Sequence, residues 1–165
     1  MVRGGDAVVL FEGWEGGKQI VKMEPIAIEK LRLYEPKKAA LENIPMEIRR
    51  LESEMRSIRS ASADGTPVSG GGSGREEMLL SNILRREEME RSLEQARDWV
   101  EQVEAARAVL SPEERTILDR FYIHPTPGVA DALATEMHID VKTVYKRRGT
   151  AMWRFCHALC GCVEN

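Results

Sequence analysis

Residues 140 to 159 read DVKTVYKRRGTAMWRFCHAL, and this stretch differs most from the rest of the chain. Residues 141 to 163 contain five basic side chains and no acidic one, although the formal net charge of the whole chain is −3. If the stretch is one α-helix, Val144, Ala151 and Phe155 share a face with the aliphatic stem of Arg148. We expect that face to lie in the core.

The opposite face of this predicted helix is polar and basic. It carries Lys142, Thr143, Lys146, Gly149, Thr150 and Trp153, with Arg147 and Arg154 on the flank. A short helix with an apolar back and a basic front suits the major groove of DNA. A basic solvated surface is also common on soluble proteins, so the charge pattern alone leaves both interpretations open.

The preceding residues favour the DNA-binding interpretation. Residues 129 to 137, VADALATEM, place apolar side chains at helical spacing, and His138-Ile139-Asp140 form a short connection. Asp140 is a suitable N-cap, because its carboxylate can accept from the backbone N–H of Lys142 or Thr143. This order predicts a helix-turn-helix, and its expected joint core is Leu133, Ile139, Val144 and Ala151.

A third helix is predicted just before these two. Ser111 as N-cap, Pro112 at the first helical position and Glu114 three residues after the cap make a capping box. Ile117, Leu118 and Phe121 should then pack beneath the helix-turn-helix. Two prolines and a glycine in the segment 124–128 should end this helix.

The segment from Leu110 onward resembles the fourth conserved region of bacterial sigma-70 factors. It is more similar still to small phage-type transcriptional regulators of the RinA/ArpU kind, which carry such a module behind a long helical segment. The residues that match are Leu110, Pro112, Glu113, Glu114, Arg115, Phe121, Tyr122, Leu133, Ala134, Met137, Asp140, Val144, Tyr145 and Lys146. His138 stands where that family has glycine, and the loop from His124 to Gly128 is longer. Histidine tolerates a left-handed turn better than most residues do.

The first part of the chain predicts an arm of two long helices. Over residues 25–60, the residues Leu41, Ile44, Ile48, Leu51, Met55 and Ile58 follow a heptad spacing. This spacing fits a coiled coil, and equally a plain amphipathic helix that packs on a neighbour. Pro36 should interrupt the helix, and Pro45 should kink it.

The next segment, 61–74, is rich in glycine and serine and predicts a flexible linker. A second long helix should span 75–109, with an apolar stripe at Met89, Leu93, Ala96, Val100, Val103 and Leu110. Its partner should be the first helix in an antiparallel hairpin, or a second copy of the chain.

The two ends of the chain should lie outside these elements. Residues 1–24 are rich in glycine and read as a flexible leader, and residues 161–165 read as a tail. The late onset of the helical pattern also fits a translation start near Val21 or Met23. With no long apolar run and no secretory signal, the sequence predicts a cytoplasmic protein.

Metal binding and catalysis are weakly indicated. Cys156, His157, Cys160 and Cys162 could hold zinc, but they do not form two Cys-x-x-Cys pairs, so core and tail positions are the favoured interpretation. The three histidines fall at turn or tail positions, and no catalytic constellation is evident. We therefore expect neither a cofactor nor an enzyme.

The sequence thus predicts an all-α protein, in which a long helical hairpin or coiled coil precedes a C-terminal domain of three helices at 110–160. Lys142, Thr143, Lys146 and Arg147 are expected at base edges, and Tyr145, Arg148 and Arg154 at phosphates. The resemblance implies a transcriptional regulator encoded by a phage or prophage. We expect double-stranded DNA as its partner, contact with RNA polymerase and a homo-oligomer. Two alternatives remain: a DNA-packaging subunit like the small terminase, and a helical adaptor that does not bind DNA.

Overall fold

A computed structural model describes residues 15–60 and 72–160, and within these ranges the protein is all-helical, as the sequence predicts. The elements are α1 (Glu15–Arg32), α2 (Tyr34–Ser60), α3 (Gly72–Ala108), α4 (Pro112–Leu118), the π-helical turn η1 (Asp119–Ile123), α5 (Val129–Glu136) and α6 (Val141–Leu159). The predicted tail, and most of the predicted linker, lie outside the described residues. None of the described helices is long and apolar enough to pass through a lipid bilayer.

The chain divides into two compact units. One consists of Met1–Arg32 together with Ala105–Asn165, and the other of Leu33–Glu104. We call them the C-terminal unit and the arm. The C-terminal unit holds α1, the last residues of α3, and every element from α4 to α6, whereas α2 and most of α3 form the arm.

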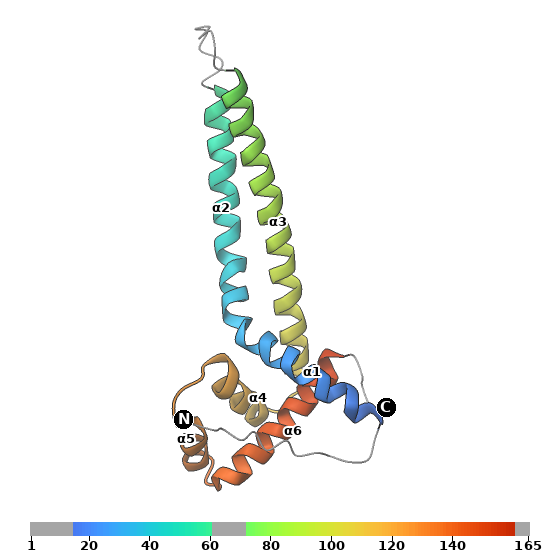
Figure 1. Ribbon diagram of the computed structural model, residues 1–165. Coiled ribbons are helices and arrows are strands. Elements are labelled where there is room, and N and C mark those ends of the chain that lie inside the picture. The colour runs from blue at the N-terminus through green and yellow to red at the C-terminus, as the bar shows by residue number, and fades with distance from the viewer. Residues whose placement is uncertain (1–14, 61–71, 161–165) are drawn as a thin grey trace, which may run out of the picture. The chain divides into compact units, whose positions relative to one another are not determined.

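Helix α1 begins ten residues earlier than the sequence predicts. It starts at Glu15, inside the stretch assigned to a flexible leader, and continues through Pro25 to Arg32. Its buried residues Ala27 and Leu31 have no exposed surface, and α1 packs on α6 and η1 (Figure 1). The early start could not be predicted from helix propensity, because glycine disfavours a helix and tertiary contacts often override that preference.

The two helices of the arm run antiparallel. Asn82 Nδ2 donates to the carbonyl of Leu51 at 2.9 Å, and Tyr34 Oη donates to Glu104 Oε1 at 2.9 Å. Residues early in α2 thus meet residues late in α3, and the ribbons run side by side in Figure 1. The helical path is interrupted at Leu33 and not at Pro36. Pro36 lies in the first turn of α2, where a residue needs no N–H to complete the helical hydrogen bonds.

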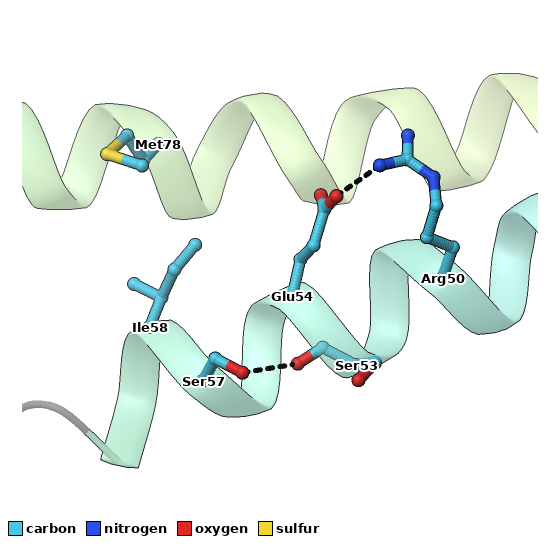
Figure 2. Close-up of a pocket in the computed structure, with 6 residues that line it drawn as sticks. All are labelled: Arg50, Ser53, Glu54, Ser57, Ile58 and Met78. Carbon is cyan, nitrogen blue, oxygen red and sulfur yellow. Dashed lines mark hydrogen bonds and ion pairs between the residues drawn. The ribbon is translucent and has the colours of Figure 1, made fainter.

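Both predicted apolar stripes lie at the contact between α2 and α3. Every one of the six heptad residues of α2 is buried or half-buried, and Pro45 lies inside one continuous helix. Of the predicted stripe on α3, Met89 and Leu93 are half-buried and Ala96, Val100 and Val103 are buried. The last predicted member, Leu110, is buried but lies beyond the end of α3, in the C-terminal unit. Near the end of α2, Figure 2 shows an open depression between the helices, lined by Ile58 and Met78 beside the ion pair of Arg50 with Glu54.

The predicted capping box is present at the start of α4. Glu114 N donates to Ser111 Oγ at 3.2 Å, and Ser111 N donates to Glu114 Oε2 at 2.9 Å, so α4 begins at Pro112. The helix passes into η1 and ends at His124, whose N–H reaches the carbonyl of Asp119 at 2.7 Å. Both predicted ends of this helix are confirmed.

A shared apolar core joins α4, α5 and α6. Its buried members are Ile117, Leu133, Ala134 and Val144, and the partly buried residues packed on them are Phe121, Val129, Met137, Ile139 and Val141. Further along α6, Ala151 and Phe155 are fully buried. The expected core residues are therefore confirmed, with Ile139 only partly buried.

Candidate nucleic-acid interface

The turn between α5 and α6 is left-handed at His138. Its φ of 53° makes it the only non-glycine residue with positive φ in the described part of the chain. The N–H of Met137 donates to Leu133 and that of Ile139 to Ala134, which closes the end of α5. Histidine therefore occupies a conformation that usually favours glycine, as its place in the sequence predicts.

Asp140 caps the start of α6. Its Oδ1 accepts from the backbone N–H of Thr143 at 2.8 Å, and its Oδ2 accepts from the Thr143 hydroxyl at 2.6 Å. These hydrogen bonds, with the hydroxyl the stronger influence, lower the pKa of the Asp140 carboxyl below its ordinary value. Thr143, expected at a base edge, thus has its hydroxyl bonded within the turn.

The exposed face of α6 is the polar face expected from the sequence. Lys142, Lys146, Gly149, Thr150 and Trp153 are all exposed along it. We call these five residues the basic row. Neither lysine has a carboxylate within ion-pair distance among residues 15–60 and 72–160, so both ammonium groups are available to a ligand.

Two predicted DNA-binding arginines are engaged within the protein. Arg147 forms an ion pair with Glu113, and Arg154 Nη1 lies 2.9 Å from Glu114 Oε1. Both acidic residues belong to the first turn of α4, so these pairs connect the start of α4 to the flank of α6. No local pattern indicates these pairs, because the partners lie 34 and 40 residues apart in the sequence.

Arg148 and Tyr145 form a different arrangement. The guanidinium carbon of Arg148 lies 5.1 Å from the ring centres of both Phe121 and Tyr145, and those two rings are 6.0 Å apart. A cation over aromatic faces is stabilised by the ring quadrupole. Tyr145 nevertheless remains 47% exposed, and this exposure leaves its edge accessible to a phosphate.

The possible zinc ligands do not form a group in the described chain. Among residues 15–60 and 72–160, no three His, Cys, Asp or Glu side chains lie close enough together to bind a metal ion, and Cys162 lies outside these ranges. The thiol of Cys156 is buried, and burial raises its pKa to about 12. A protonated thiol in an apolar setting is a packing group and a poor metal ligand.

Comparisons with protein-family models, with curated proteins and with solved structures found no match for this chain.

Proposed function

We propose that the chain is a sequence-specific DNA-binding transcriptional regulator, in which α5, the turn at His138 and α6 act as a helix-turn-helix. The observation that carries the proposal is the basic row, with two unpaired lysines on a helix whose other face is buried. A helix anchored in this way can enter a groove without giving up any of its core contacts. Its net positive surface would attract the phosphates of a duplex even though the whole chain is acidic.

The position of the lysines supports contact with base edges. Lys142 and Lys146 lie in the first two turns of α6, and recognition helices contact bases with their N-terminal residues. Lysine can donate to O6 and N7 of guanine, so the preferred site should contain guanine at the contacted positions. Arg154, nearer the other end of α6 and 52% exposed, would contact a phosphate.

The ion pairs on the flank of α6 are compatible with this proposal. The side chains of Arg147 and Glu113 are 42% and 47% exposed, so the pair is a surface pair worth about 1 kcal/mol or less. A phosphate can therefore replace Glu113 as the partner of Arg147 when DNA binds. The pair of Arg154 with Glu114 is different, because the Glu114 side chain is only 13% exposed and also accepts from the backbone N–H of Ser111.

We also propose that the arm joins two copies of the chain. Three exposed apolar residues share one side of α3 at helical spacing, namely Leu80, Ile83 and Leu84. Exposed glutamates flank them at 76, 77, 87 and 88. A second copy offers the complementary charge, because Arg49, Arg56 and Arg59 on α2 are exposed and have no carboxylate partner among the described residues. A dimer would present two recognition helices to two half-sites.

Selection from a pool of random duplexes tests the DNA-binding proposal. The wild-type chain should enrich one sequence, and its affinity for that duplex should fall with salt with a log–log slope of about −4 to −5, as about four to six phosphate contacts require. The double substitution Lys142→Ala and Lys146→Ala should abolish the enrichment. Lys38→Ala, which removes an exposed lysine from the arm, is the control and should bind normally. A wild-type chain that enriches nothing refutes the proposal.

Sedimentation equilibrium tests the dimer separately. Leu80→Gln combined with Leu84→Gln should convert a dimer to a monomer. Met46→Gln changes an apolar residue of α2 that is similarly exposed, and this control should remain dimeric. A wild-type chain that is monomeric at all concentrations would exclude this use of the arm without affecting the DNA-binding proposal.

A further inference from the structure

Gly149 has no role inside the protein that explains its presence. It lies near the middle of α6, its φ is not positive, and a Cβ built on it would meet no atom within 4 Å. Glycine in a helix interior is less stable than alanine, because it loses more backbone freedom on folding. Neither a turn nor a close neighbour within the described chain offsets this cost.

The surroundings of Gly149 indicate where an external group would lie. Gly149 belongs to the basic row, one helical turn after Lys146 and one turn before Trp153. The Thr150 hydroxyl donates to the Lys146 carbonyl at 3.2 Å and is therefore directed along the helix. The helix backbone at Gly149 is therefore exposed and has no side chain of its own to cover it.

We propose that Gly149 is the point at which the sugar-phosphate backbone of bound duplex DNA comes closest to α6. This inference rests on the proposed function and names the residue that limits how deeply the helix enters the groove. A residue without a Cβ lets the duplex backbone come into contact with the helix backbone. A methyl group at this position would keep the duplex farther away. The ring of Trp153, 40% exposed and one helical turn further along the same face, would pack on the adjacent sugar.

The substitution Gly149→Ala separates this role from a structural one, because the two roles predict opposite changes in Tm. Alanine should raise Tm by about 2–5 °C, since it favours the helix and meets no neighbour. The same variant should bind the duplex selected by the wild-type chain at least tenfold more weakly. Gly149→Leu should bind more weakly still, since its side chain is larger.

Gly74→Ala is the matched control. Gly74 is also exposed, lies within α3, and would bring its Cβ into open space. This variant should leave DNA affinity unchanged.

The outcomes are distinguishable from a failure of the proposed function. If Gly149→Ala and Gly149→Leu bind the selected duplex as tightly as the wild-type chain, the inference is overturned and the DNA-binding proposal stands. If Gly149→Ala lowers Tm, the glycine is structural, and the inference is again overturned. If the wild-type chain selects no duplex, the proposed function fails and the inference fails with it.

Discussion

The ion pair between Glu113 and Arg147 leads to a quantitative prediction about DNA binding. If Arg147 leaves Glu113 for a phosphate, the wild-type chain must break the pair in order to bind. The pair is about half exposed, and such pairs contribute about 0.2–1 kcal/mol. The substitution Glu113→Gln removes this cost, and should therefore tighten binding about 1.5-fold to 5-fold.

Fluorescence anisotropy of a labelled, selected duplex at several KCl concentrations measures this effect. Arg147→Ala should reduce the steepness of the salt dependence by about 0.9, the value for one phosphate contact. In the Arg147→Ala background there is no pair to break, so Glu113→Gln should no longer give the gain in affinity of about 1.5-fold to 5-fold. This double-mutant cycle isolates the coupling between the two side chains.

A matched control removes the same charge from another surface pair. Arg120 Nη1 lies 2.5 Å from Glu136 Oε2 in the C-terminal unit, and these side chains are about as exposed as those of Arg147 and Glu113. Glu136→Gln is therefore a suitable control. If Glu136→Gln tightens binding as much as Glu113→Gln does, the effect is one of general charge. An unchanged salt dependence for Arg147→Ala would refute the exchange of partners.

Three further predictions concern the C-terminal unit. Phe155→Ala should lower the free energy of unfolding in urea by about 3–5 kcal/mol, because Phe155 has no exposed surface and its removal leaves a cavity. In a Cys162→Ser background at pH 8, a thiol reagent should modify the exposed Cys160 quickly and Cys156 only on unfolding, since burial raises the pKa of Cys156 to about 12. Asp140 has a lowered pKa in the folded chain, so its stabilisation is fully present above its unfolded pKa of about 3.9 and is lost as pH falls through the folded value. The difference in urea midpoint between wild type and Asp140→Ala should accordingly narrow as the pH is lowered below about 3.9.

Local signals in the sequence predicted the ends of the helices in the C-terminal unit. Ser111 and Asp140 each cap a helix through a residue three positions on, a distance that sequence spacing alone can reveal. The left-handed turn at His138 was indicated by the resemblance, in which glycine stands at this position, and not by the local pattern. The heptad spacing of α2 likewise identified the face that contacts α3.

Contacts between distant residues could not be predicted in this way. Helix α1 begins at Glu15 in spite of its glycines, and it packs on α6 and η1, which lie far along the chain. The partners of Arg147 and Arg154 depend on where the start of α4 lies beside α6. A sequence read one segment at a time therefore assigned all five basic residues of α6 to DNA, although their surroundings differ.

The arginines and the lysines of α6 have different surroundings because a guanidinium and an ammonium group differ in chemistry. All three arginines of α6 make contacts within the C-terminal unit, Arg147 and Arg154 with carboxylates and Arg148 with aromatic rings, whereas Lys142 and Lys146 make none among the described residues. A planar guanidinium suits fixed pairs and stacking, and a compact, strongly hydrated ammonium stays in solvent. In the free protein the arginines thus have partners, whereas the two lysine side chains are available for contact with base edges. If the arginines carried sequence recognition instead, replacing Lys142 and Lys146 would weaken binding to every duplex alike and would leave the preference for one sequence unchanged.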